Sequence, residues 1–333
     1  MKLSKLFLGM GVLAAMTACE STPKGYVING EISSASEGTV YLKRVEDKTF
    51  SITDSAQIVN GKFTLEGILP HGAEAYGLTT SPTDNSPLLF FLENGKLKVS
   101  IDEESKQISV EGSESDRFFR KVQEYAKQDG LLIDTLVANH PDSPVAAYLL
   151  MKSYSWGFDT QGLKALRDQM TPALENSFYM EQLNDLISRK ERVDVGQVAP
   201  EISLPDPDGN LQSLSSLRGK YVLLDFWASW CPDCRREIPE VVNAYEKLKD
   251  KNFTIFSVSL DRAKDPWVKA IGQYGLNWTH VSELKYWQSE VVNQYAIRWI
   301  PAYFLLDPEG RILSVSLDSD GLVKSLENTF GAY

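Results

Sequence analysis

Hydrophobic and polar residues alternate in short runs over about residues 25–112, which is the pattern of β-strands with one buried face. Dipeptides suited to tight hairpin turns separate these runs, namely Asn60-Gly61 and Asn94-Gly95. The apolar run 88–92 is typical of a buried strand, with a binding surface as the alternative. The pattern predicts a small antiparallel β domain over residues 25–114, in which we find no catalytic constellation.

The hydrophobic period changes from that of strands to that of helices at about residue 115. One face of the first predicted helix carries Phe118, Phe119, Val122 and Tyr125. Breaks between successive helices are expected at Pro141, Pro144 and Gly157. We therefore expect a helical connector over residues 115–193 that packs against one or both neighbours, with its aromatic residues in the core.

Residues 194–333 show nearly continuous apolar strands that alternate with helical stretches. The run 221–227 predicts a buried central strand, Pro232 starts a helix, and the run 253–258 predicts a second buried strand. Strand, helix and strand of this length indicate a parallel βαβ unit and hence an α/β domain. Further elements are expected as a hairpin at Asp208-Gly209, helices at 265–274 and 289–296, strands at 302–306 and 311–315, and a last helix from about Asp320.

The N-terminus has the layout of a bacterial export signal: Lys2 and Lys5 precede an apolar stretch, 6–16, that is too short to span a membrane comfortably. Residues 16–19, ending in Ala18-Cys19, resemble the lipobox of bacterial lipoproteins. That resemblance implies cleavage after residue 18, a lipid on Cys19 and a membrane tether over residues 19–24. The alternative is an ordinary secretory signal with an incidental cysteine.

Charge and histidine content exclude several classes of function. The chain of 333 residues has a net charge of −11, and we see no stripe of Lys and Arg such as a nucleic-acid partner would require. The three histidines, His71, His140 and His280, lie far apart without a second ligand at metal-binding spacing. We therefore expect no nucleic-acid partner, no metal site and no bound cofactor.

Cysteine usage points to redox chemistry. If Cys19 carries lipid, a single pair remains in an oxidising compartment, Cys231 and Cys234. A disulfide that closes so small a loop stabilises a fold only weakly, and a zinc site would need two further ligands that the sequence does not offer. At the start of a helix, the dipole and the free N–H groups favour a Cys231 thiolate, so we expect an exposed nucleophile there and a shielded resolving thiol at Cys234.

Several motifs in a fixed order resemble the thioredoxin superfamily, and most closely its TlpA- and ResA-like envelope branch. They are the apolar strand, Trp230-Cys231-Pro232-Asp233-Cys234, Glu237-Ile238-Pro239, and Ile300-Pro301 before a further strand. The resemblance implies a thioredoxin fold and a protein that reduces disulfides or apocytochrome thiols outside the cytoplasm, as in cytochrome c biogenesis. Residues 25–112 resemble a β-rich domain of unknown function that precedes such domains in some bacterial envelope lipoproteins.

The same resemblance assigns roles around the disulfide. Pro301 matches a cis-proline that faces the disulfide and leaves the backbone of Ile300 free to pair with an extended substrate, although Ala302 stands where the family commonly has Thr. Trp230 and Trp227 are expected at the rim of the site. The two residues between the cysteines, Pro232 and Asp233, are expected to meet substrate as well.

Two carboxylates are candidates for proton transfer. Asp225 matches the buried acid of thioredoxins, and burial without a cation should raise its pKa and let it accept the proton of Cys234. Glu237 matches the glutamate of the ResA-like branch; the alternative is a surface residue that pairs with Arg235 or Arg236. The sequence does not decide which carboxylate moves the proton.

These observations predict a lipid-anchored, periplasm-facing thiol-disulfide oxidoreductase of the cell envelope. The sequence does not decide between the inner and the outer membrane as the site of the anchor. Protein disulfides or thiols are its expected partners, and a membrane electron donor its expected reductant. Reduction is the favoured direction: the family resemblance implies it, and Pro232-Asp233 lacks the histidine that helps strong oxidants stabilise their thiolate. The competing hypotheses are a peroxiredoxin-like antioxidant enzyme and a binding lipoprotein with incidental thiols.

Overall fold

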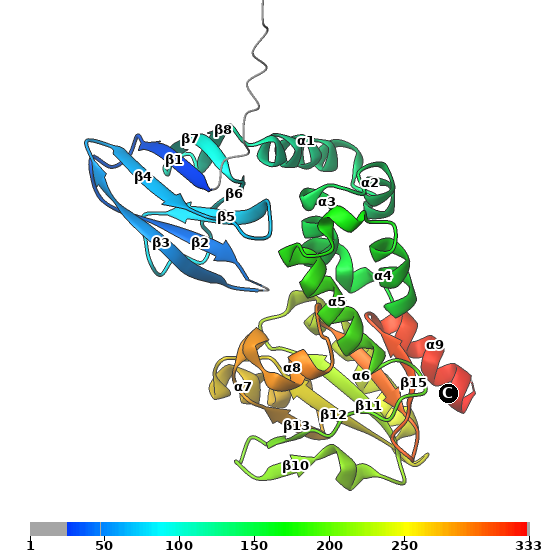
Figure 1. The fold of residues 1–333 in the computed structure, drawn as a ribbon. Helices are drawn as coiled ribbons and strands as arrows, with labels where there is room; N and C mark the ends of the chain where they lie inside the picture. The colour runs from blue at the N-terminus through cyan, green and yellow to red at the C-terminus, as the bar shows by residue number, and fades with distance from the viewer. Residues whose placement is uncertain (1–24, 47, 332–333) are drawn as a thin grey trace, which may run out of the picture.

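A computed structural model describes residues 25–46 and 48–331. The described chain forms a β unit, a helical unit and an α/β unit in chain order, with the α/β unit in the lower part of Figure 1. The predicted signal peptide 1–18, the tether 19–24 and Cys19 lie outside the described residues. Within the described residues, no helix has the length and apolar character needed to cross a membrane.

The β unit is a single sheet, as the alternating pattern predicts. Its described strands number eight and run in the order β6-β5-β2-β3-β4-β1-β7-β8. All neighbours are antiparallel except β1 and β7, which run parallel, so the expected antiparallel sheet contains one parallel pair. The strands are β1 (Tyr26–Ile32), β2 (Glu37–Val45), β3 (Phe50–Val59), β4 (Lys62–Gly67), β5 (Glu74–Thr79), β6 (Leu88–Leu92), β7 (Gly95–Asp102) and β8 (Gln107–Glu111).

The two predicted hairpin turns of this unit have different outcomes. Asn60 and Gly61 both adopt positive φ, 50° and 74°, and join β3 to its neighbour β4, as a tight hairpin requires. Asn94 precedes β7, and β7 is not a neighbour of β6 in the sheet, so the predicted second hairpin is wrong. The Asn94 side chain instead donates to the Leu69 carbonyl at 2.9 Å and accepts the Leu69 N–H at 3.0 Å. A turn signal fixes the bend but not the strand that comes next in the sheet.

The helical unit packs against both neighbours. The Ala75 N–H of β5 donates to the Tyr179 hydroxyl at 2.6 Å, and Phe91 of the β unit and Ala296 of the α/β unit both belong to the helical core. The helices are α1 (Glu114–Asp129), α2 (Ile133–Asn139), α3 (Pro144–Leu149), which continues as a π-helix (Leu150–Tyr154), α4 (Thr160–Arg167) and α5 (Phe178–Glu191).

The α/β unit has the thioredoxin-like architecture that the motifs imply. Its main sheet, within the described residues, has five strands in the order β13-β12-β11-β14-β15, and β11 pairs parallel with β12 and antiparallel with β14. A small hairpin of β9 and β10 closes at Asp208-Gly209, as predicted. The elements are β9 (Ser203–Pro205), β10 (Leu211–Ser213), β11 (Tyr221–Trp227), α6 (Pro232–Leu248), β12 (Phe253–Ser259), α7 (Lys264–Tyr274), β13 (Thr279–Ser282), α8 (Glu290–Gln294), β14 (Ala302–Leu306), β15 (Ile312–Ser316) and α9 (Ser319–Phe330).

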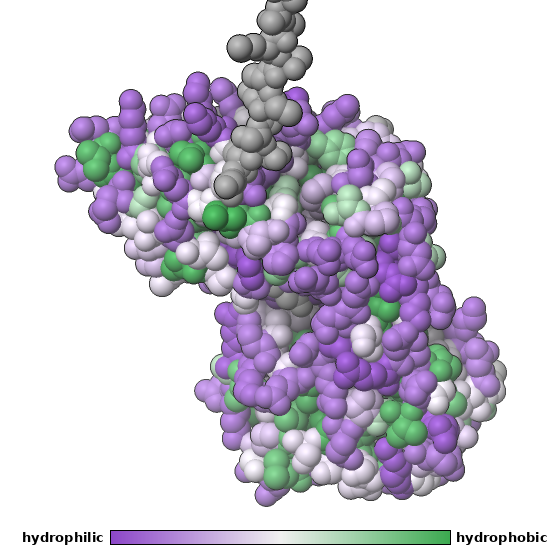
Figure 2. Space-filling view, viewed as in Figure 1, coloured by the Kyte–Doolittle hydropathy of each residue, from purple (hydrophilic) through white to green (hydrophobic). Residues whose placement is uncertain are grey.

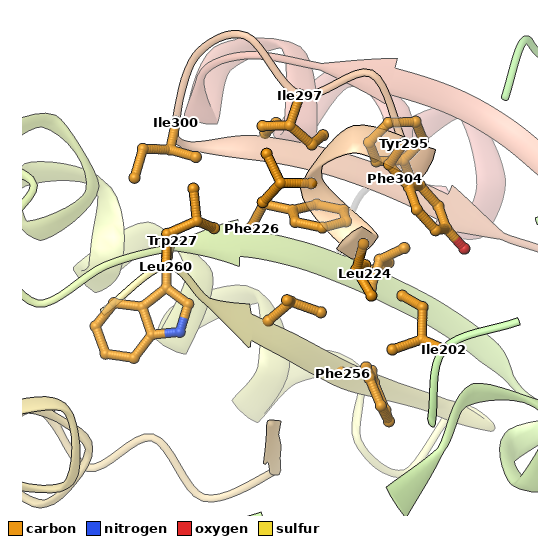
Figure 3. Packing of buried hydrophobic residues seen from close by; sticks show 14 of the residues in the cluster. Ile202, Leu224, Phe226, Trp227, Phe256, Leu260, Tyr295, Ile297, Ile300 and Phe304 are labelled. Atoms are coloured by element: carbon orange, nitrogen blue, oxygen red, sulfur yellow. The ribbon is translucent and has the colours of Figure 1, made fainter. Parts of the chain in front are cut away.

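Alternate residues of the central strands face two different cores, because successive side chains of a strand point to opposite faces. Leu223 packs with residues of α6 and α9 on one face. Phe226, Phe256 and Phe304 pack on the other face together with residues of α7 and α8 (Figure 3). Truncation of such a buried ring to alanine typically costs about 3–5 kcal/mol, so these residues fix the position of the loop that follows β11.

The units meet at a hollowed waist. Figure 2 shows a largely hydrophilic face that is hollowed between the β unit and the α/β unit. The Lys48 ammonium, beyond the end of β2, lies 4.9 Å from the centre of the Trp287 ring in the α/β unit. The boundaries at residues 114 and 193 that we drew between the units stay predictions.

Candidate active site

Cys231 is the N-cap of α6, at the end of the loop that follows β11. Pro232 occupies the first turn, where a missing N–H costs nothing and the fixed φ suits a helix. The Cys231 sulfur is bonded to the Cys234 sulfur and accepts the Cys234 N–H at 3.1 Å. The helix end therefore points the Cys234 N–H at Cys231 Sγ, and this N–H and the helix dipole would stabilise a thiolate there.

Both sulfurs are covered. The exposed fraction of Cys231 is 4%, and that of Cys234 is 2%, so the expectation of an exposed Cys231 is wrong for the disulfide form. The cause is the neighbouring loop: Cys231 Sγ lies 3.6 Å from the carbonyl oxygen of Ile300, and Ala228 and Ile300 share a core cluster with the disulfide. In the disulfide form, Cys231 therefore leaves little surface open to a partner.

The Ile300–Pro301 peptide bond is cis, as in the family that the motifs resemble. Ile300 and Pro301 are buried, and β14 begins directly after them with Ala302 opposite Phe226 of β11. The pairing of these strands brings the loop before β14 to the same end of the sheet as Cys231. Figure 3 shows Ile300 at this end, beside Trp227 and Leu260.

Asp225 is a buried acid on the central strand, as predicted. Burial raises its pKa to about 7; the Glu237 charge adds to the rise, and the Ser257 hydroxyl, which donates to Asp225 Oδ2 at 2.7 Å, opposes it. The Trp278 indole N–H donates to the same hydroxyl at 2.8 Å and orients it. Asp225 and Cys234 line one small cavity, which makes the carboxyl a candidate acceptor for the Cys234 proton.

Glu237 lies on α6 and is partly buried. Burial raises the pKa of its carboxyl, and the Tyr303 hydroxyl donates to it at 3.5 Å. The arginines that could have held it at the surface contact other groups: Arg236 pairs with Asp233 at 2.8 Å, and Arg235 donates to a backbone carbonyl at 3.1 Å. Glu237 therefore faces Tyr303 rather than an arginine partner at the surface.

The exposed rim beside the disulfide is aromatic. Trp230 is half-exposed, donates its indole N–H to the Leu260 carbonyl at 3.2 Å, and contacts the rings of Tyr286 and Trp287. Trp227, by contrast, is buried, so its predicted place at the rim is wrong. Trp227 is the last residue of β11, a strand that is covered on both faces, and its side chain packs in the same core cluster as Phe226.

Sequence reasoning missed several residues of this region. Ser257 had a signal: it and Asp225 are polar residues inside two apolar strands, and the parallel register places them opposite each other. Tyr303, Trp287 and Lys48 had none, because each comes to the site from a segment far away in the chain.

Among residues 25–46 and 48–331, no three His, Cys, Asp or Glu side chains gather closely enough to hold an ion. His280 is buried beside Trp227, and burial lowers its pKa to about 4, so it is neutral at physiological pH.

A cysteine pair at the N-terminus of α6, on a five-stranded sheet of this order and beside a cis-proline, defines a thioredoxin-like thiol-disulfide oxidoreductase. The AhpC/TSA family matches residues 195–315, and a domain of unknown function, DUF4369, matches residues 26–119. Both matches agree with the resemblances that the sequence motifs suggest.

Named relatives place the chain more narrowly. Thiol-disulfide oxidoreductase ResA from Bacillus subtilis (strain 168) is 32% identical over 132 residues, which cover 40% of this chain and 72% of that protein. ResA from Geobacillus kaustophilus (strain HTA426) is 31% identical over a match that covers 43% of this chain and 83% of that protein. A crystal structure is known for the thioredoxin domain of a thiol-disulfide oxidoreductase from Bacteroides vulgatus. Its sequence is 40% identical, and the match covers 41% of this chain and 97% of that chain with a TM-score of 0.39. The chain belongs to the ResA-like thiol-disulfide oxidoreductases through its α/β unit.

Proposed function

We propose that this protein reduces disulfide bonds of other proteins in the cell envelope, and that Cys231 forms a mixed disulfide with each substrate. The observation that carries the proposal is the position of Cys231 Sγ, which is bonded to Cys234 at the start of α6 and lies 3.6 Å from the Ile300 carbonyl. A helix N-terminus favours the thiolate that attacks, and the neighbouring sulfur is close enough to complete the exchange.

The reaction has two exchanges. In the first, the Cys231 thiolate attacks one sulfur of the substrate disulfide; a bond between Cys231 and the substrate forms, the substrate disulfide breaks, and the other substrate sulfur leaves as a thiolate. In the second, Cys234 loses its proton and attacks Cys231 Sγ; the bond between Cys231 and Cys234 forms, and the second substrate thiolate leaves. Two electrons pass from the protein dithiol to the substrate, so a dithiol reductant must then regenerate the enzyme.

Asp225 is the base that we assign to the second exchange. It lines a cavity with Cys234, and a pKa of about 7 allows it to accept a proton near neutral pH. Glu237 acts through the charge it places near Asp225, because that charge raises the pKa of Asp225. Trp230 and the Ile300 backbone contact the incoming segment, and Pro232 and Asp233 lie beside them at the helix start.

The envelope location and the lipid anchor are part of this proposal and rest on residues 1–19. A membrane dithiol donor fits both the anchor and the need for regeneration. In the native bacterium, the full chain should partition with membranes, and mass spectrometry of its mature N-terminal peptide should find a lipid on Cys19. Cys19→Ser, which also changes the cleavage site, should lack that lipid mass. A wild-type Cys19 without lipid would remove the anchor from the proposal.

Insulin reduction with dithiothreitol as the donor tests the activity. The wild-type protein should accelerate it, and Cys231→Ser should lower the rate by at least about 10³-fold, as expected for loss of a nucleophile. Unchanged activity in Cys231→Ser would instead favour a binding lipoprotein with incidental thiols. Rapid consumption of peroxide by the wild type would favour the peroxiredoxin-like alternative. A reduction potential of about −270 mV supports the reducing direction, and one of about −120 mV would reverse it.

A further inference from the structure

A cavity of about 400 Å³ lies where the helical unit meets the α/β unit. Its lining includes Arg298, Trp299 and Ala302, the residues on either side of Ile300–Pro301. Since the Ile300 carbonyl lies 3.6 Å from Cys231 Sγ, the cavity and the disulfide share this short segment as a common border. The volume falls in the range of cavities that bind small groups, which also occur preferentially at domain interfaces.

The helical unit holds the cavity wall in place. An Arg298 guanidinium nitrogen donates to the Met151 carbonyl at 2.9 Å. The Trp299 ring stacks on Trp156 of the helical unit, with 5.1 Å between ring centres, and Ala296 packs in the helical core. The loop before Pro301 is therefore built by two units, and its wall is preorganised rather than loose.

Large apolar surfaces are exposed among the lining residues. Trp156 and Trp299 are 39% and 40% exposed, and Val315 of β15 adds an apolar wall that is 43% exposed. Partly exposed tryptophans beside a cavity are typical of sites that contact a partner strongly, because they bury much area with little loss of side-chain entropy.

The charges that line the cavity balance. Lys190 and Arg298 are cations, and Asp159 and Asp194 are anions, of which Asp194 accepts a hydrogen bond from Thr160 at 2.6 Å. The cavity therefore offers no net charge to select an ionic group. Much of the remaining lining is apolar and includes Phe158, Val193, Tyr295, Ile297, Phe304 and Leu317.

We infer that this cavity is a specificity subsite, which takes an aromatic or branched aliphatic side chain of the protein substrate close to the cysteine that exchanges with Cys231. The inference rests on the proposed function and narrows its substrate class. An extended chain advances about 3.3 Å per residue, so a segment that lies beside Ile300 reaches Trp299 and the cavity within about four residues. The helical unit thereby takes part in substrate choice.

Short peptides test this inference with the full-length reduced protein. Each has a central cysteine joined by a disulfide to cysteamine in a Gly/Ser background, and a single Phe is placed in turn at each neighbouring position. For the wild type, we expect the best Phe peptide to exceed the Gly/Ser parent by about tenfold in kcat/KM, as burial of a ring allows.

Variants on both walls locate the preference. Trp156→Ala and Val315→Glu should each reduce the advantage of the best Phe peptide over the Gly/Ser parent to less than about twofold in kcat/KM. The controls are Tyr125→Ala, an exposed ring elsewhere in the helical unit, and Leu313→Glu, which shares a face of β15 with Val315 but lies outside the cavity; both should retain it. Reduction of hydroxyethyl disulfide should be equal in all variants, since it is too small to reach the cavity while it exchanges.

Two outcomes would overturn the subsite. One is a wild-type protein without any position-dependent preference for Phe; the other is a preference that survives both wall variants. Failure of the wild type to reduce hydroxyethyl disulfide at all would instead contradict the proposed function, so the two failures are distinguishable.

Discussion

Asp225 and Cys234 line the same small cavity, on the inner side of the disulfide and away from the exposed rim. The carboxyl comes from β11 and the sulfur from the first turn of α6, and both are buried. In the mechanism that we propose, this arrangement separates two tasks: Cys231 meets the substrate beside Ile300, while the proton of Cys234 is handled inside the protein. The predictions below follow from that separation.

Asp225→Asn should slow the second exchange and leave the first nearly unchanged. An amide cannot accept the Cys234 proton, and loss of a positioned base costs about 10²–10⁴-fold. Rapid mixing of reduced protein with a model disulfide peptide would show accumulation of the mixed disulfide in the variant. Equal rates of release in the variant and the wild type would exclude Asp225 as the base.

Ser257→Ala and Glu237→Gln should move the pH dependence of release in opposite directions. The Ser257 hydroxyl lowers the pKa of Asp225, so its removal raises the pH midpoint; the Glu237 charge raises that pKa, so its removal lowers the midpoint. Release of the substrate should increase with pH as Asp225 ionises, with a midpoint of about pH 7 in the wild type. Shifts in the same direction for both variants would show that another group controls the profile.

Asp225 should also make the oxidised protein less stable as pH rises. Its folded pKa of about 7 lies above the ordinary 3.8, so the folded state holds the proton more tightly, and stability present below pH 3.8 is lost as pH rises through 7. Relative to wild type, Asp225→Asn should therefore gain about 2–4 kcal/mol in the free energy of unfolding between pH 4 and pH 8. Urea unfolding at both pH values measures this gain, and a pH-independent difference would contradict it.

Lys48→Ala should change the global stability by less than about 1 kcal/mol, because an exposed cation–π contact contributes no more than that. The structural consequence should be local. Trp287 should become more accessible to a fluorescence quencher. The measurement uses a protein in which the other exposed tryptophans are replaced by phenylalanine, so that Trp287 dominates the quenched signal. Lys62→Ala, an exposed lysine elsewhere in the β unit, is the control and should leave quenching unchanged.

Much of the α/β unit follows from local sequence. The continuous apolar run of β11, the helix-starting Pro232 and the cysteine spacing are local signals, and they place Cys231 at a helix N-terminus without any knowledge of tertiary contacts. The register of two buried strands would also have placed Ser257 beside Asp225.

Other features depend on segments that meet only in three dimensions. Cys231 is covered because Ile300 comes from a distant loop, and Trp227 is buried because helices cover both faces of its sheet. Asn94 lies between β6 and β7, which are not neighbours in the sheet, and a turn motif does not encode which strands pair. The stacking of Trp156 on Trp299 likewise joins two units, and neither tryptophan carries a local signal of its partner.

Covalent trapping tests the central role of Cys231 most directly. Reduced Cys234→Ser protein, mixed with a disulfide-bonded protein substrate, should accumulate a mixed disulfide through Cys231 that mass spectrometry can assign and dithiothreitol can reverse. Cys231→Ser under the same conditions should form little or none, because Cys234 lies within α6 and lacks the N-cap position that stabilises a thiolate at residue 231. A mixed disulfide that forms equally well through Cys234, or none at all with Cys234→Ser, would contradict the assignment of Cys231 as the sulfur that meets the substrate.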